Sequence, residues 1–142
     1  MGYSHYWEWH GTPDKGRLSA CLADMQRLVD AAQQPLAGPE DDEDQELGPL
    51  QFAFNGIGDH AAEPFEFPGF DGFNSCKTRH RPYDEIVTAC LLVARNHFPP
   101  EMLEISSDGK WAADWQKGAR LYSAVFDREA CNPLCADGRA GA

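Results

Sequence analysis

The sequence contains no apolar run of the roughly 18 residues that a membrane-spanning helix requires. Its opening string, MGYSHYWEWH, lacks the charged and apolar segments of a secretory signal peptide, and Tyr6 stands where an N-myristoylation signal has serine or threonine. These absences predict a cytoplasmic protein without a membrane partner. A chain of 142 residues can bury one hydrophobic core but is too short for two domains and a linker.

Cysteine occurs five times, and no two cysteines form a C-x-x-C pair. An odd number without that spacing argues against a secreted disulfide framework and against a standard zinc knuckle. Cys131 and Cys135 form a C-x3-C pair, but two thiols without a nearby histidine make a weak metal site. We therefore expect reduced thiols, no metal and no cofactor.

Positive charge is scarce, because 12 lysines and arginines face 23 aspartates and glutamates, for a formal net charge of -11. The stretch EDDEDQE at 40–46 supplies six of the acids and is typical of a mobile, solvated loop, which we place at 35–49. Direct binding of duplex nucleic acid is disfavoured, since phosphate neutralisation needs extended cationic patches. An alternative is that the acids imitate a nucleic-acid backbone and occupy the basic groove of a partner protein.

The periodicity of apolar residues predicts an α+β fold with one domain at 1–126 and a C-terminal tail at 127–142. The expected order of strand, helix, strand, strand, helix, strand and helix allows a small antiparallel sheet with helices on one face, as in a ferredoxin-like split βαβ arrangement. We place the strands at 2–10, 50–55, 64–68 and 102–106, and helices after the N-cap Thr12, from Pro82 and after the SDGK turn at 107–110.

Residues 76–85, CKTRHRPYDE, concentrate cations in an otherwise acidic chain. Because Pro82 suits the first position of a helix, these cations precede a helix N-terminus, where free backbone N–H groups and the helix dipole favour an anion. The competing interpretation is that the cations neutralise neighbouring acids at exposed sites, and the sequence favours neither. The candidate ligands of a phosphate or carboxylate are Lys77, Thr78, Arg79 and Arg81.

Aromatic side chains offer a surface for the flat part of such a ligand. Alternation in the first strand places Tyr3, His5, Trp7 and Trp9 on one face. We take His5 and Trp7 as candidates for contact with a base or a sugar whose phosphate the cations hold. The alternative is that these rings belong to the hydrophobic core.

Catalysis has one weak candidate in the sequence. Cys76 precedes the cationic residues, and a helix N-terminus with nearby cations lowers the pKa of a thiol and raises its thiolate fraction. His5 or His80 would then act as the base. No G-x-S-x-G, H-E-x-x-H, Walker-loop or H-x-E zinc-deaminase signature is present, so a binding protein is favoured over an enzyme.

Four strings of the sequence resemble a family of small bacteriophage, prophage and bacterial proteins that begin Met-Gly-Tyr-x-His-Tyr-Trp. The strings are MGYSHYW at 1–7, FNG at 54–56, CKTRHRPYD at 76–84 and SSDGKW at 106–111. The resemblance spans nearly the whole chain and implies a context rather than a chemistry, namely a phage or mobile-element accessory protein that acts inside a bacterial host. His80, the acidic segment at 40–46 and the cysteine-bearing tail depart from the family.

The sequence leads to three hypotheses of function. The favoured one is a non-catalytic domain that binds an anionic, nucleotide-like small molecule, which would counter host defence by sequestering a signal. The first alternative is an acidic inhibitor, anti-CRISPR-like or a DNA mimic, that docks on a host nucleic-acid-binding complex. The second is a small cysteine-dependent enzyme. The expected partner is thus an anionic small molecule or a bacterial host protein.

Overall fold

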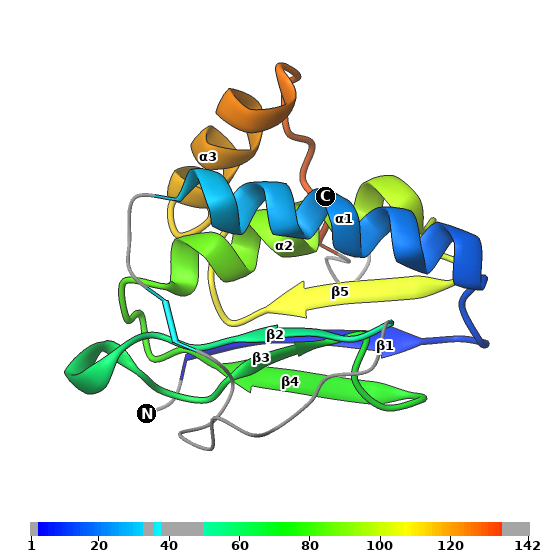
Figure 1. Ribbon diagram of the computed structural model, residues 1–142, viewed down its shortest axis with the longest axis horizontal. Helices are drawn as coiled ribbons and strands as arrows, with labels where there is room; N and C mark the ends of the chain where they lie inside the picture. The colour runs from blue at the N-terminus through cyan, green and yellow to red at the C-terminus, as the bar shows by residue number, and fades with distance from the viewer. Residues whose placement is uncertain (1–2, 33–35, 38–49, 135–142) are drawn as a thin grey trace.

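The computed structural model describes residues 3–32, 36–37 and 50–134 (Figure 1). The predicted α+β class is confirmed, and within the described residues no helix has the length and apolar character needed to cross a bilayer. The elements are β1 (Ser4–Trp9), α1 (Lys15–Ala31), β2 (Phe52–Phe54), the 3-10 helix Gly58–His60, β3 (Phe65–Phe67), β4 (Phe73–Lys77), α2 (Asp84–His97), β5 (Leu103–Ser107) and α3 (Gln116–Phe126).

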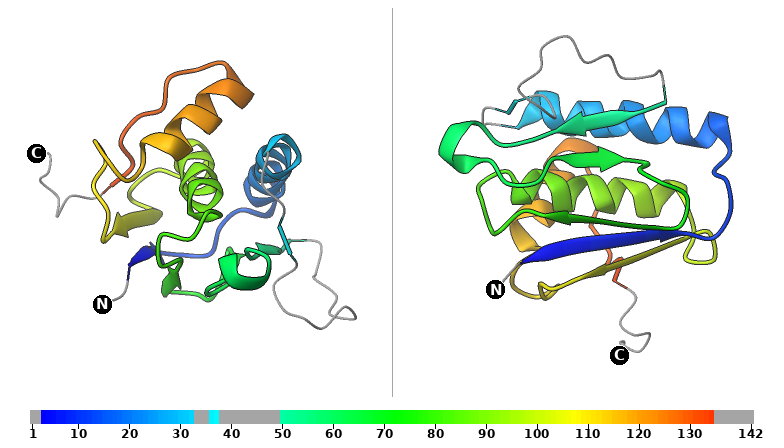
Figure 2. Two further views of the ribbon diagram at one scale, coloured as in Figure 1. Left: turned by 90° about the vertical axis from the view of Figure 1, so that its left-hand side faces the viewer. Right: turned by 90° about the horizontal axis from the view of Figure 1, so that it is seen from below.

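β1 is the central strand of a three-stranded antiparallel sheet with the order β4-β1-β5. The register places Ser4 opposite Lys77 on β4 and Trp9 opposite Leu103 on β5. β2 and β3 pair with each other, as the sequence predicts, and lie beside β4 without joining its ladder (Figure 2). The described strands therefore form two small antiparallel sheets instead of the one four-stranded sheet that the sequence allowed.

The strand order agrees in part with a ferredoxin-like sheet. Both neighbours of β1 run antiparallel to it, and a helix connects β4 to β5. The fourth strand of such a sheet would lie beside β4, at the place that the β2–β3 pair occupies. Because that pair has no ladder to β4, the ferredoxin-like arrangement stays an interpretation.

Helices α1, α2 and α3 lie on one face of the sheet, and no described helix covers the other face (Figures 1 and 2). α2 lies between the other two helices, and it buries every residue at 86–94. The predicted alternation of β1 is confirmed, because Tyr3, His5, Trp7 and Trp9 all face the helices and are buried. The prediction of a small antiparallel sheet with helices on one face is therefore confirmed.

Aromatic rings of β1 and β3 join the two sheets in one core. The ring centroid of Trp7 lies 5.3 Å from that of Phe65 and 6.1 Å from that of Phe67. The indole N–H groups of Trp7 and Trp9 both donate to the carbonyl oxygen of Pro68 at 3.0 Å. Trp7 is only 2% exposed, so in this structure it is a core residue, and it does not line the pocket beside the cationic segment.

Two helices begin later than the sequence suggested. Asp14, rather than Thr12, is the N-cap of α1, since its carboxylate accepts the backbone N–H of Arg17 at 2.9 Å. α2 begins at Asp84 rather than Pro82, because a turn precedes it in which the N–H of Asp84 donates to the carbonyl oxygen of Arg81. The cationic segment is therefore part strand and part turn.

β4 is the strand that the sequence analysis missed. Phe73 faces away from the helices and is 60% exposed, whereas Asn74 faces the helices and is buried. This inverted pattern lacks the apolar alternation by which strands are recognised. Asn74 is satisfied in its buried position because its side chain accepts the N–H of Phe70 and donates to the Phe70 carbonyl oxygen.

The described part of the predicted tail packs against the domain. Pro133 is buried, and its carbonyl oxygen accepts a hydrogen bond from the Arg95 guanidinium at 3.3 Å. Ala130 and Leu134 also contact the core. The acidic segment at 40–46, and Cys135 with the residues after it, lie outside the described residues.

The close crossing of α2 and α3 gives a test of this packing. A Cβ atom at Gly118 would lie 2.0 Å from Oγ1 of Thr88 and 2.9 Å from the carbonyl oxygen of Glu85. We expect Gly118→Ala to lower the free energy of unfolding by about 1–3 kcal/mol in urea denaturation. Gly16→Ala is the matched control in α1, where the nearest atom is the N-cap oxygen Oδ2 of Asp14 at 3.1 Å; a shift of a few tenths of an ångström relieves this contact, and the higher helix propensity of alanine offsets its cost, so the loss should be much smaller than for Gly118→Ala. Equal stability of the two variants would contradict the crossing.

Candidate functional site

Polar side chains from four parts of the chain meet beneath the start of α2. Nε2 of His5, on β1, lies 2.6 Å from Oδ1 of Asp84, and the Thr78 hydroxyl donates to the same oxygen at 2.5 Å. Nδ1 of His5 lies 2.8 Å from Oγ of Ser107 at the end of β5. His5 and Thr78 are fully buried. These four residues, which we call the His5 network, join β1, β4, β5 and α2.

Hydrogen-bond counting assigns the proton on the His5 ring. The Ser107 hydroxyl oxygen accepts the indole N–H of Trp115 at 3.1 Å and the backbone N–H of Gly109 at 2.8 Å. Both of its lone pairs are then used, so its one proton is donated to Nδ1 of His5. The ring proton must therefore sit on Nε2 and be donated to Asp84. In this assignment each polar group of the His5 ring has a partner.

In the His5 network a serine, a histidine and an aspartate are linked by hydrogen bonds, but the network does not have the properties of a catalytic triad. A nucleophilic serine needs a free lone pair and access to substrate. Both lone pairs of the Ser107 hydroxyl accept hydrogen bonds from N–H groups, and the ring of His5 is fully buried. The arrangement is suited to orienting the start of α2 rather than to acyl transfer.

Tyr3 connects the His5 network to the cationic turn. Its ring stacks on that of His80, with centroids 3.4 Å apart, and meets the His5 ring edge-on at 5.2 Å. The buried Tyr3 hydroxyl has no hydrogen-bond partner among the described residues. It packs against Gly109, where an added Cβ atom would lie only 2.2 Å from the hydroxyl oxygen. Burial, and after it the carboxylate of Asp84, raises the pKa of Tyr3 well above its usual value, so the phenol stays protonated.

The turn between β4 and α2 is strained. Arg79 and His80 have left-handed backbone φ angles of 56° and 59°, which cost on the order of 1–3 kcal/mol each for residues other than glycine. The N–H of Arg79 donates to the carbonyl oxygen of Tyr3, and that of Arg81 to the carbonyl oxygen of Thr78. With the Tyr3–His80 stack, these bonds hold the turn in a conformation that presents His80 and Arg81 at the surface.

A surface pocket of about 240 Å³ opens between this turn and the residues at the start of α3. Two of its three acids also accept hydrogen bonds within the protein, since Oδ1 of Asp84 belongs to the His5 network and Oδ2 of Asp114 accepts the N–H of Lys110 at 2.8 Å. The charged and titratable residues of the pocket are His80, Arg81, Asp84, Glu85, Asp114 and Lys117.

The cations of the pocket form no close ion pair with acids of the described chain. Among the described residues, the close contacts between a basic and an acidic side chain are His5–Asp84, His10–Glu104, Arg27–Asp24 and His97–Asp24. None of them involves Arg81 or Lys117, nor Lys77 or Arg79. Arg81 and Lys117 nevertheless share the pocket with Asp84, Glu85 and Asp114, so the interpretation that the cations offset neighbouring acids stays a prediction beside that of an anion site.

The predicted anion ligands do not all reach the same place. Arg81 lines the pocket, and Thr78 lies beneath it, where its hydroxyl is bound to Asp84. Arg79 is exposed beside the pocket without lining it. Lys77 is part of β4, where its backbone binds Glu63. Of the cations in this segment, Lys77 thus belongs to the sheet and Arg81 to the pocket.

The aromatic residues of the site also differ from the prediction. His5 is fully buried beneath the pocket, with Tyr3 and Trp115 each edge-on to its ring, so no face of it is available to a ligand. His80 and Lys117, which the sequence analysis did not propose as ligands, line the pocket instead. The signal for His80 was its place among the cations, whereas Lys117 has no signal without the fold.

Cys76 does not have the environment of a nucleophile. It is fully buried, and its S–H donates to the carbonyl oxygens of Glu63 and Pro64 at 3.5 Å. Burial, with the nearby carboxylates of Glu63 and Asp84, raises the pKa of Cys76 to about 12. The expected lowering of its pKa is wrong, because Cys76 points into the core while the cations lie at the surface.

Comparison with known proteins adds no family to this geometry. No protein-family model, no curated protein and no solved structure matches the chain. The functional argument therefore depends on the pocket and the His5 network that supports it.

Removal of the Asp84 carboxylate tests the His5 network. Asp84→Ala leaves two buried donors without an acceptor, the Nε2–H of His5 and the hydroxyl of Thr78. We expect a loss of about 2–4 kcal/mol in the free energy of unfolding, measured in urea. Glu85→Ala removes the adjacent acid, whose side chain has no hydrogen bond within the described chain, and should change stability by less than about 0.5 kcal/mol. Similar losses in both variants would contradict the network.

Proposed function

We propose that the protein binds an anionic small molecule in the pocket between the cationic turn and the start of α3. The observation that carries the proposal is the meeting of His80, Arg81 and Lys117 around one pocket, with neither Arg81 nor Lys117 paired to an acid of the described chain. A guanidinium binds phosphate or carboxylate through two parallel hydrogen bonds, and an ammonium adds a point charge.

The other residues of the pocket favour a nucleotide over a bare phosphate. Glu85 and Asp114 are acceptors at the same pocket, and they suit the hydroxyl and amino donors of a sugar or a base. His80 is exposed and stacks on Tyr3 through one face, so that its other face can support a planar ring. His80, supported by the buried ring of Tyr3, thus replaces His5 and Trp7 as the proposed contact for the flat part of the ligand.

The size of the pocket limits the ligand. Sites for drug-sized molecules usually enclose about 300–1,000 Å³, and the pocket has about 240 Å³. It therefore favours one phosphate with its adjoining sugar, and the rest of a larger nucleotide would extend into solvent. Arg79, exposed next to the turn, is placed to meet such an extension.

The resemblance to phage proteins supports a biological use for this binding. A protein that sequesters a nucleotide signal of host defence needs affinity and no catalysis, which agrees with a buried Cys76 and with a Ser107 that has no free lone pair. We therefore propose signalling nucleotides of the bacterial host as the ligand class.

Docking on a host protein is the second candidate. The uncovered face of the sheet carries Glu8, Glu104 and Asp108 beside the exposed ring of Phe73. Phe70 is 78% exposed close to that face. An acidic surface with exposed aromatic rings suits a basic partner protein. Docking on a host protein becomes the favoured function if no small anion binds to the pocket.

A thermal-shift panel of linear and cyclic nucleotides, with inorganic phosphate, tests the proposal. A ligand at 100 times its dissociation constant should stabilise the wild type by about 2.7 kcal/mol, and phosphate should bind more weakly than the best nucleotide. Arg81→Ala should weaken binding at least about tenfold, since a hydrogen bond to a charged group contributes about 1.5–3 kcal/mol. Arg17→Ala, an exposed arginine of α1, is the control. The proposal fails if no nucleotide shifts the melting temperature or if both variants bind as the wild type does.

A further inference from the structure

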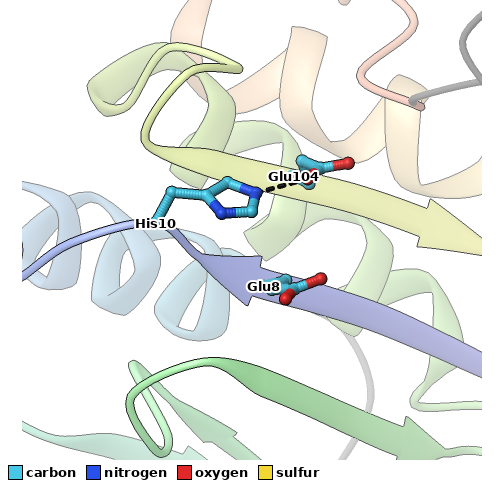
Figure 3. Close-up of side chains that lie close together, drawn as sticks. All are labelled: Glu8, His10 and Glu104. Carbon is cyan, nitrogen blue, oxygen red and sulfur yellow. Dashed lines mark hydrogen bonds and ion pairs between the residues drawn. The ribbon is translucent and has the colours of Figure 1, made fainter.

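β1 and β5 bring three potential metal ligands together at the end of the sheet away from the pocket. Glu8 lies on β1, His10 follows two positions later, and Glu104 on β5 lies directly opposite Glu8. The three side chains stand on the same side of the two strands (Figure 3). One ligand atom from each residue lies within 4.8 Å of the other two.

The charges at this place are unbalanced. Like charges directly opposite each other on neighbouring strands destabilise a sheet, and Glu8 and Glu104 form such a pair. No lysine or arginine of the described chain forms an ion pair with either carboxylate. The nearest basic group is the imidazole of His10, whose Nε2 contacts Oε1 of Glu104. A cation placed among the three side chains would remove the repulsion.

Their chemistry selects the class of cation. One imidazole nitrogen and two carboxylates are ligands of Zn²⁺ and other divalent transition metals, whereas Mg²⁺ and Ca²⁺ prefer oxygen alone. Ligand atoms bound at about 2.0–2.2 Å from one ion lie about 3–4 Å from each other. His10 and Glu104 are 40% and 48% exposed, so their side chains can rotate by the small amount that this needs.

We propose that Glu8, His10 and Glu104 bind one divalent transition-metal ion, with Zn²⁺ as the ion to test. The three protein ligands leave at least one coordination position for water, on the face of the sheet that no described helix covers. The ion would join the end of β1 to the start of β5 and cancel the repulsion between the two glutamates. The sequence analysis expected no metal from the cysteine spacing, and it did not find these ligands, which come from two strands and form no contiguous motif.

The site is independent of the anion pocket. His5 and Ser107, which support the pocket, lie at the opposite end of the β1–β5 ladder from Glu8 and Glu104. Loss of one site should leave the other unchanged, so the two proposals can fail separately.

Calorimetric titration of the full chain with ZnCl₂ tests the site. The wild type should bind one Zn²⁺ at this site, and MgCl₂ should give no measurable binding. Glu104→Gln, which keeps the shape of the side chain, and His10→Ala should each weaken binding at least about tenfold, since loss of even an outer-shell partner of a ligand typically costs about 10–100-fold. His60→Ala, at an exposed histidine of the 3-10 helix, is the matched control and should bind as the wild type does.

Two outcomes would overturn the assignment. One is a wild type that binds no Zn²⁺. The other is binding that survives in both Glu104→Gln and His10→Ala, which would place the ion on other groups, such as the exposed thiol of Cys131. Thermal unfolding with and without Zn²⁺ provides a second readout, since an ion that clips β1 to β5 stabilises the folded chain of the wild type and not that of Glu104→Gln.

Discussion

The hydrogen bonds of the His5 ring are the constraint on which the site depends. They join the end of β5, through Ser107, to the start of α2, through Asp84, and Thr78 ties the end of β4 to the same carboxylate. Buried polar groups are costly when they lose a partner, so a fully bonded group of this kind specifies one arrangement of the strands and the helix. The position of the cationic turn follows from that arrangement, because the turn connects two of the joined elements.

This constraint helps to explain how two cations, Arg81 and Lys117, come to line one pocket of a very acidic protein beside three acids. Oδ1 of Asp84, a residue that lines the pocket, accepts hydrogen bonds from His5 and Thr78, so this carboxylate is held by the protein itself. The strained backbone at Arg79 and His80 turns the chain sharply after β4, and the ring of Tyr3 supports His80 from below. Residues with strained backbone are frequent at functional sites, and this is one reason why we propose the anion site at this turn. The uncovered sheet face, with its opposed glutamates, concentrates acid away from this pocket.

Much of the fold could be predicted from the sequence, and less of the site. The alternation of β1 and the pairing of β2 with β3 followed from periodicity, since each places large apolar rings on one face. β4 could not be found in this way, because Phe73 faces solvent and Asn74 is buried through its own hydrogen bonds. For the site, Arg81 was identified by its local charge, but the inward direction of Thr78 and the approach of Lys117 from α3 depend on the packing of distant elements. His5 was identified as important for the wrong reason, as it supports the pocket without reaching it.

The protonation of His5 tests the central claim most directly. Long-range proton–nitrogen correlation NMR distinguishes a ring nitrogen that carries a proton from one that does not. The network requires a neutral ring with the proton on Nε2, donated to Asp84, and a bare Nδ1 that accepts from Ser107. Observation of that tautomer at neutral pH would support the account. A proton on Nδ1, whether alone or together with one on Nε2, would show that Ser107 and Asp84 do not hold the ring as described.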